Sequence, residues 1–235
     1  MYKYIIFDVD NTLFDFECAF RAAQRNVAAK LGMELSKEYT ALDEKIGWKA
    51  WNESNLDRTE LEDIQKNYHP YYYQYLRNYY SELIRELGVD IDVEELVEVY
   101  IMSISESKAF MEPHTMQVYR SLAKHFKLAL ATNGLERIQK SRVSDLEPYT
   151  YKAYISECLD CVKPSKQFFE YMIQDLKCNP EECLMVGDSL INDMMGAKSV
   201  GMDVCFYNRK KKDIPKDLMI DYEINSIQEL IKILL

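Results

Sequence analysis

The sequence predicts an α/β protein with a Rossmann-like parallel-sheet core and an inserted all-helical cap domain. Short apolar runs recur along the chain, helical patterns separate the later runs, and residues 16–112 show helical periodicity without a convincing strand. Strands that alternate with helices need crossover connections, which place the strands parallel in one sheet. A helical block inserted after the first strand is expected to lie beside the carboxyl end of that strand.

Five apolar runs have the length and composition of buried strands. They are Tyr4–Phe7, Leu128–Ala131, Ala153–Ile155, Cys183–Val186 and Val204–Phe206. A weaker run near Tyr222–Ile224 precedes a C-terminal helix that reaches Leu235. The helical patterns that connect the later runs lie at Leu135–Leu146, Ser165–Leu176 and Leu190–Val200.

The inserted block contains four segments with helical periodicity. They are Ala19–Leu31, Lys37–Trp51, Thr59–Leu87 and Val93–Lys108. Proline has no backbone N–H and clashes with the preceding turn, so Pro70 predicts a break that divides the third segment into two helices. We therefore expect a core of residues 1–15 and 113–235 and a cap of residues 16–112.

Composition and charge narrow the possible functions. A chain of 235 residues with 48% hydrophobic residues can hold one large domain or a core with an insertion. The net charge of −10 argues against a nucleic-acid polymer as partner. The sequence shows no signal segment and no apolar run of bilayer length, so we expect a cytoplasmic protein without a membrane partner. The six cysteines lack the spacing of a zinc site and are expected to be free thiols.

Two aspartates stand two residues apart at the end of the first predicted strand. Alternate residues of a strand point to the same side, so Asp8 and Asp10 begin on one face. Crowded carboxylates repel each other, and a cation between them or a role in proton transfer makes the crowding tolerable. An Asp-rich turn would have the same composition, so the interpretation depends on the motifs that follow.

Further polar motifs lie near the ends of later predicted strands. In open parallel sheets, ligands bind at the carboxyl ends of the strands, so these motifs are expected to meet Asp8 and Asp10. Each motif alone could be a helix cap or a turn, but their order and placement together indicate one site. They are Thr132-Asn133-Gly134, Lys163-Pro164, and Gly187-Asp188-Ser189 with Asn192-Asp193 one turn later.

These residues match what phosphoryl transfer to an aspartate requires. Asp8 would attack phosphorus and form an acyl-phosphate. Asp10 would protonate the leaving oxygen and then deprotonate the attacking water. Thr132 and Lys163 would hold the phosphoryl oxygens, and Asp8 and Asp188 would supply the oxygen ligands of Mg²⁺. The expected substrate is a small phosphorylated metabolite.

The motifs together resemble those of the haloacid dehalogenase-like hydrolase superfamily. The resemblance implies that Asp8 is the nucleophile and that Asp10 is the general acid and base, with its backbone carbonyl on Mg²⁺. It implies that Asp188 completes the protein ligands of the metal and that Asp193 orients Lys163 or a metal-bound water. The residues that would bind the phosphoryl group are Thr132, Asn133 and Lys163. The matching stretches are Asp8-Val9-Asp10-Asn11-Thr12-Leu13, Thr132-Asn133-Gly134, Lys163-Pro164 and Gly187-Asp188 with Asp193.

Within that superfamily, the chain is similar to the YjjG/YfnB-type pyrimidine 5′-nucleotidases, which implies a nucleoside 5′-monophosphate as substrate. The similarity includes Ile155-Ser156-Glu157 and Met185-Val186-Gly187-Asp188. A sugar-phosphate or acylneuraminate-phosphate phosphatase, a phosphomutase and a dehalogenase are alternatives on the same fold. A non-catalytic binding protein would be expected to lack at least one of four residues that are all present, namely Asp8, Asp10, Lys163 and Asp188.

Aromatic residues are concentrated in the predicted cap. The tyrosines between Tyr71 and Tyr80 could stack on a nucleobase, but packing between cap helices is the expectation. Trp48 and Trp51 share one helix face, and at least one of them is expected in the cap core. The basic run Arg209–Lys212 is expected to be a solvated loop.

Overall fold

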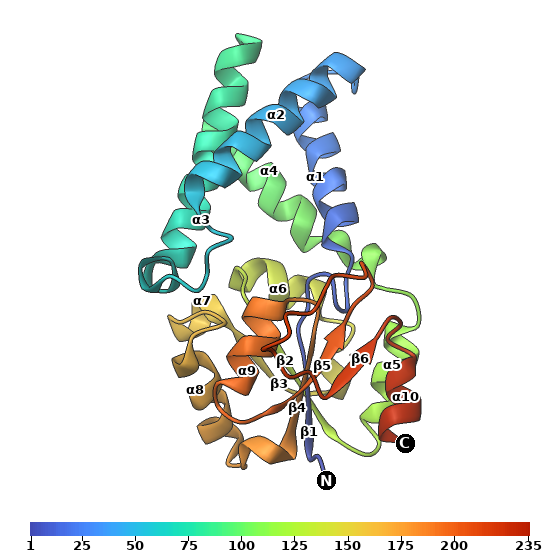
Figure 1. The fold of residues 1–235 in the computed structure, drawn as a ribbon. Helices are drawn as coiled ribbons and strands as arrows, with labels where there is room; N and C mark the ends of the chain where they lie inside the picture. The colour runs from blue at the N-terminus through green and yellow to red at the C-terminus, as the bar shows by residue number, and fades with distance from the viewer.

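The computed structural model describes all 235 residues and shows a sheet-containing core with a block of helices at one end (Figure 1). The six strands form one parallel sheet in the order β3-β2-β1-β4-β5-β6. All six predicted strands are therefore present. Their bounds are β1 Tyr4–Phe7, β2 Lys127–Thr132, β3 Thr150–Ile155, β4 Cys183–Gly187, β5 Asp203–Tyr207 and β6 Tyr222–Ile224.

The helices of the core differ in part from the predicted ones. The pattern over Leu135–Leu146 forms a helix of only 7 residues, and the pattern over Leu190–Val200 divides into a π-helix, η4, and one short α-helical turn. The sequence patterns did not indicate helix α5. The core helices are α5 Thr115–Leu122, α6 Glu136–Arg142, α7 Ser156–Leu159, α8 Lys166–Leu176, η4 Leu190–Met195, α9 Gly196–Lys198 and α10 Glu229–Leu234.

Helices cover both faces of the sheet. Ile5 and Phe7 pack on one face in a cluster with residues of α5 and α10. Tyr4 and Ile6 point to the other face and pack with residues of α8 and α9. Because both faces are buried, the central strands are continuous apolar runs rather than alternating ones.

The inserted segment forms four helices above the carboxyl end of the sheet, while both chain termini lie at the opposite end (Figure 1). The prediction that Pro70 divides the third segment is wrong, because α3 continues through it. Tyr68 stacks on Tyr72 across the proline, with ring centroids 6.4 Å apart, and this packing supports the helix where one backbone hydrogen bond is lost. The cap helices are α1 Phe16–Lys30, α2 Lys37–Ser54, α3 Glu62–Leu87 and α4 Val93–Ser105.

The cap has its own apolar cluster. The expected packing of tyrosines between cap helices is confirmed for Tyr75, Tyr79 and Tyr80, which are all buried. Trp51 packs edge-on against Tyr75, with ring centroids 5.4 Å apart, whereas Trp48 is 67% exposed. None of the helices is both long and apolar enough to cross a bilayer.

Candidate active site

The first motif begins where the central strand ends. β1 lies between β2 and β4, so the loops after these two strands flank the residues that follow β1. The backbone N–H of Asp8 donates to the carbonyl of Val186 at 2.9 Å and extends the pairing of β1 with β4 by one residue. This pairing places the side chain of Asp8 at the carboxyl edge of the sheet, as the sequence predicted.

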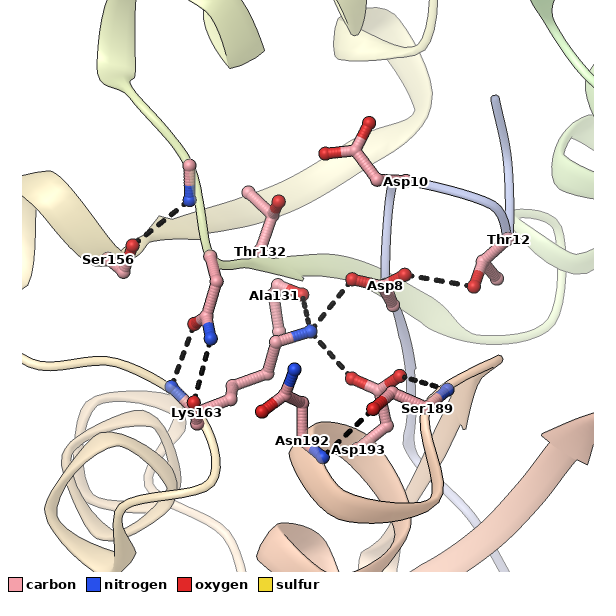
Figure 2. Close-up of polar contacts among 12 residues, drawn as sticks. Asp8, Asp10, Thr12, Ala131, Thr132, Ser156, Lys163, Ser189, Asn192 and Asp193 are labelled. Carbon is pink, nitrogen blue, oxygen red and sulfur yellow. Dashed lines mark hydrogen bonds and ion pairs between the residues drawn. The ribbon is translucent and has the colours of Figure 1, made fainter. Parts of the chain in front are cut away.

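Two side chains hold the carboxylate of Asp8, which is buried (Figure 2). The ammonium of Lys163 donates to Oδ1 at 2.8 Å, and the hydroxyl of Thr12 donates to Oδ2 at 2.9 Å. Burial raises the pKa of Asp8, and the charge of Lys163 opposes that shift. The carboxylate is therefore fixed in orientation, and additional positive charge would favour its ionised form.

Lys163 connects three of the motifs. Its ammonium group donates to Asp8 Oδ1 at 2.8 Å, to Asp193 Oδ1 at 2.6 Å and to the carbonyl of Ala131 at 2.7 Å (Figure 2). Burial lowers the pKa of this lysine, but the carboxylates of Asp193 and Asp8 raise it by more, so the net shift is upward. Lys163 therefore carries a full positive charge into the buried site.

Three carboxylates meet beside this lysine. Oxygen atoms of Asp8, Asp188 and Asp193 all lie within 4.8 Å of one another. Burial raises the pKa of each of the three groups. Ionised carboxylates at this separation repel one another, and a cation with hard oxygen ligands relieves that repulsion. The donor set thus fits a divalent cation such as Mg²⁺.

The two carboxylates contributed by the fourth motif have different surroundings. Asp193 uses both of its oxygens within the protein, because Oδ1 accepts from Lys163 at 2.6 Å and Oδ2 accepts from the N–H of Ser189 at 3.0 Å. Asp188 accepts a longer hydrogen bond of 3.3 Å from Lys212, and the same ammonium donates to the Asp188 carbonyl at 2.8 Å. Asp188 is thus the less engaged of the two carboxylates.

Asn133 joins the second motif to the third. Its side-chain amide donates to the carbonyl of Lys163 at 2.7 Å and accepts from the N–H of Lys163 at 2.8 Å. The neighbouring Thr132 is 2% exposed, and its hydroxyl accepts a hydrogen bond of 3.0 Å from Gln139. Asn133 therefore fixes the loop that carries Lys163.

The carboxylate of Asp10 has different partners from that of Asp8. The guanidinium of Arg142 donates to Oδ1, and the amide of Gln139 donates to Oδ2 at 2.7 Å. Figure 2 shows the carboxyl group of Asp10 turned away from Asp8. Arg142 and Gln139 lie three residues apart on α6 and act on the same side chain. Asp8 and Asp10, which stand two residues apart just after β1, thus have separate environments.

A cavity of about 670 Å³ extends from Asp10 into the cap. The core contributes Asn11, Asn133 and Gly134 to its wall, and the cap contributes mostly aromatic side chains. These cap residues are Phe16 and Phe20 of α1, Trp48 and Trp51 of α2, Tyr68, Tyr72, Tyr75 and Tyr79 of α3, and Tyr100 of α4. A ligand in this cavity would contact both domains.

The family is decided by a sequence match that spans both the core and the inserted helices. The model of the haloacid dehalogenase-like hydrolase family matches residues 2–201. The chain belongs to this family. This haloacid dehalogenase-like hydrolase is therefore an enzyme of the phosphatase type, as the four motifs predicted, and phosphatases of this family act on small phosphorylated metabolites.

Individual relatives of this hydrolase cover nearly its whole length. The structure of the HAD-type hydrolase YfnB from Bacillus subtilis, solved bound to magnesium, superimposes with a TM-score of 0.82 and 26% identity over 99% of this chain and 98% of that one. The pyrimidine 5′-nucleotidase PynA of Streptococcus pneumoniae is 27% identical over 98% of this chain and 94% of its own. A glyceraldehyde 3-phosphate phosphatase of Methanopyrus kandleri is 28% identical over 99% and 97%.

Several residues of the hydrolase site were not predicted from the sequence. Arg142 and Gln139 belong to no sequence motif. The only sign of their role in the sequence was their spacing, which puts them on one face of the helix that follows Thr132. The prediction of a solvated basic loop is confirmed for Lys210, Lys211 and Lys212, which are exposed, whereas Arg209 is partly buried. Arg209 pairs with the buried Glu112, and Lys212 contacts Asp188, because carboxylates from distant segments face this loop.

Proposed function

We propose that this hydrolase is a Mg²⁺-dependent phosphomonoesterase that acts through an aspartyl-phosphate at Asp8, with pyrimidine nucleoside 5′-monophosphates as substrates. In this proposal residues 1–15 and 113–235 form the catalytic core and residues 16–112 form the cap. The core grips the phosphoryl group, which is common to all candidate substrates. The cap discriminates among the groups attached to it.

The first chemical step belongs to Asp8 and Asp10. A carboxylate oxygen of Asp8 attacks phosphorus, and the bond between phosphorus and the ester oxygen breaks. Asp10 gives its proton to the leaving oxygen, so that an alcohol departs. Lys163 and the hydroxyl of Thr132 hold the phosphoryl oxygens as charge develops on them, and Asn133 keeps Lys163 in place.

The second step regenerates the enzyme. Asp10, now a carboxylate, takes a proton from a water molecule, and the water oxygen attacks phosphorus. The acyl-phosphate bond breaks, which regenerates the carboxylate of Asp8 and releases inorganic phosphate. In-line attack puts the leaving oxygen on the side of phosphorus opposite Asp8, and the observed orientation of Asp10 away from Asp8 supports its role there.

The proposed metal ligands are the carboxylates of Asp8 and Asp188 and the backbone carbonyl of Asp10. Asp193 would orient Lys163, to which its Oδ1 is bonded at 2.6 Å, while its Oδ2 accepts from the N–H of Ser189 at 3.0 Å. Bound Mg²⁺ would neutralise charge between the substrate phosphate and the carboxylates. The related YfnB structure was solved bound to magnesium, which supports Mg²⁺ as the cation.

The observation that carries the substrate proposal is the aromatic cavity between Asp10 and the cap. Its volume of about 670 Å³ is in the range of small-molecule sites, which is roughly 300–1,000 Å³. Aromatic walls suit a flat base better than a sugar rich in hydroxyls. A triose phosphate, the substrate named for the M. kandleri relative, would leave most of this cavity unfilled. The relationship to PynA supports the same substrate class.

The alternative chemistries on this fold fit the site less well. A dehalogenase attacks carbon and needs neither a second carboxylate nor a metal, whereas Asp10 and Asp188 are both present. A non-catalytic binding protein would not need the complete set of charged residues around Asp8. A sugar-phosphate or acylneuraminate-phosphate phosphatase shares every residue of the core, so the choice between these substrates depends on the cap.

A comparison of kcat/KM with Mg²⁺ for four phosphate esters tests the proposal. We expect kcat/KM to be higher for UMP and dTMP than for glucose 6-phosphate and an acylneuraminate 9-phosphate. An advantage of tenfold or more for either sugar phosphate, which is about 1.4 kcal/mol of transition-state binding, would remove the nucleotidase assignment and leave the phosphatase chemistry in place.

A further inference from the structure

The cap contains a buried carboxylate without a cationic partner. Asp43 on α2 is 3% exposed, yet it lines the cavity that begins at Asp10. Its Oδ1 accepts from the hydroxyl of Tyr79 at 2.7 Å, and its Oδ2 accepts from the amide of Gln24 at 2.6 Å. The charged side chain that acts on it is Glu44, a second carboxylate in the wall of the same cavity. Buried carboxylates are ordinarily paired with a cation or bind a ligand, so the isolation of Asp43 requires an explanation.

The position of Asp43 is defined by the two helices that hold it. Gln24 lies eight residues beyond Phe16, which is about 12 Å along α1 from the end nearest the core. Tyr79 lies ten residues beyond His69, which contacts Ser156 of the core, and this is about 15 Å along α3. Asp43 therefore lies at the far end of the cavity from the phosphoryl-binding residues. The group attached to a phosphate bound at Asp8 would extend from Asp10 toward the part of the cavity that Asp43 lines.

The hydrogen-bonding capacity of Asp43 is only partly used. An ionised carboxylate has about four lone-pair positions, and Tyr79 and Gln24 occupy two of them. Burial raises the pKa of Asp43, and the hydrogen bonds from Tyr79 and Gln24 oppose that shift. In its ionised form Asp43 accepts hydrogen bonds and gives none, so it selects a ligand that presents a donor. Sugar hydroxyls can accept or donate, whereas the imide of uracil and the amine of cytosine present N–H groups at the ring edge.

We propose that Asp43 is a specificity-determining residue that accepts a hydrogen bond from an N–H group on the base edge of the substrate. This inference rests on the proposed function, because it assumes a nucleotide in the cavity. Tyr79 and Gln24 act as positioning residues that hold the carboxylate toward the cavity. The aromatic walls select a flat ring, and Asp43 selects among rings by their donors.

The first arm of the test uses the unmodified enzyme and substrate analogues. UMP is compared with its N3-methyl derivative, which keeps the ring and the phosphate but lacks the N–H donor, and with ribose 5-phosphate, which lacks the base. The N3-methyl compound cannot form the hydrogen bond to the carboxylate of Asp43. We expect this loss to lower its kcat/KM by about 10- to 100-fold relative to UMP. This arm does not depend on the folding of any variant.

The second arm uses Asp43→Asn and Tyr79→Phe. The expected result is that the ratio of kcat/KM for UMP to that for ribose 5-phosphate falls by about 10-fold or more in Asp43→Asn and less in Tyr79→Phe, mainly through KM. Glu53→Gln is the matched control, because it removes the same charge from an exposed position on the same helix, outside the cavity. That control should keep the wild-type ratio.

The outcomes separate this inference from the proposed function. If UMP is the better substrate but N3-methylation and Asp43→Asn both leave the ratio within twofold, Asp43 does not read the base and the inference is overturned while the nucleotidase assignment stands. If the wild-type enzyme prefers the sugar phosphates by tenfold, the proposed function fails first, and the inference that depends on it falls with it.

Discussion

Arg142 and Asp10 form an ion pair in which the guanidinium is completely buried. Gln139 donates to the second oxygen of the same carboxylate at 2.7 Å. The Nε and one terminal nitrogen of Arg142 have no hydrogen-bond partner, so the contact of the other terminal nitrogen with Asp10 is its main polar interaction. Burying the charge of an arginine costs free energy unless its carboxylate partner stays in place. The pair therefore fixes the orientation of the proposed general acid.

We expect Arg142→Met to slow the hydrolysis of alkyl phosphates more than that of p-nitrophenyl phosphate. Alkoxide departure needs a positioned proton donor, which contributes about 10²- to 10⁴-fold, whereas nitrophenolate leaves without one. Single-turnover rates of aspartyl-phosphate formation on the two kinds of ester measure this difference. Asp10→Asn should likewise lose more rate on the alkyl ester than on the aryl ester. Lys140→Met on the exposed side of the same helix is the control, and Arg142→Lys should recover part of the rate.

The same variants show whether Arg142 acts through Asp10. The double variant Asp10→Asn/Arg142→Met should be no slower on an alkyl ester than Asp10→Asn alone, because the interaction is already lost. Additive losses would instead show that Arg142 supports the site independently of Asp10.

We expect Asp8→Asn to lose essentially all phosphatase activity while retaining the fold. An amide is a poor nucleophile and a poor cation ligand, but it matches the carboxylate in shape. Its oxygen can still accept from Lys163, and its NH2 group can donate to the hydroxyl of Thr12. Steady-state turnover and thermal unfolding together check this, and Asp90→Asn in the exposed loop after α3 is the control. Turnover of Asp8→Asn near the wild-type rate would refute the nucleophile assignment.

Removal of divalent cations should abolish hydrolysis, and added Mg²⁺ should restore it. Oxygens of Asp8, Asp188 and Asp193 lie within 4.8 Å, and a dianionic phosphate would add to their repulsion. Mg²⁺ should also raise the melting temperature of the wild-type protein, because a ligand of the folded state stabilises it. The increase should be smaller in Asp188→Asn. Full activity in a metal-stripped sample would contradict the proposed chemistry.

Gly187→Ala should disturb the site through Asp193. A Cβ at this position would lie 2.2 Å from Asp193 Oδ2 and 2.7 Å from its Cβ, so the whole side chain must shift. Asp193 is 1% exposed and bonded to Lys163, so it has little room to move. We expect a loss of about 1–3 kcal/mol in unfolding free energy, together with reduced turnover. Urea denaturation measures the first effect, and an unchanged midpoint would show that the site adapts.

The contact between His69 and Ser156 should weaken in acid. His69 Nε2 lies 2.8 Å from the hydroxyl of Ser156, and burial lowers the pKa of this histidine below its usual value. Because the folded state disfavours the protonated ring, its contribution to stability is complete above about pH 6.5 and declines as the pH falls below it. The difference in melting temperature between wild type and His69→Gln should therefore shrink from pH 7.5 to pH 5.5. A constant difference would exclude this linkage.

The motifs were predictable because each is short and local. Asp8, Asp188 and Thr132 directly follow apolar runs, and the parallel sheet brings the ends of such runs to one edge. The strands themselves were predictable because burial on both faces makes them continuous apolar runs. Pro70 shows the limit of such local rules, because the stacking of Tyr68 on Tyr72 sustains a helix that proline alone would interrupt.

The sequence by itself determined the six strands, most of the helices, the insertion after β1 and the motif residues proposed to carry the chemistry, because these depend on periodicity and on neighbours along the chain. Only the tertiary structure decided that Arg142 pairs with Asp10 and that Asp43 lies at the end of the cavity. These contacts join residues that are 132 positions apart in one case and come from separate helices of the cap in the other. The physical reason is that helix packing, rather than local propensity, sets which polar side chains meet in a buried space.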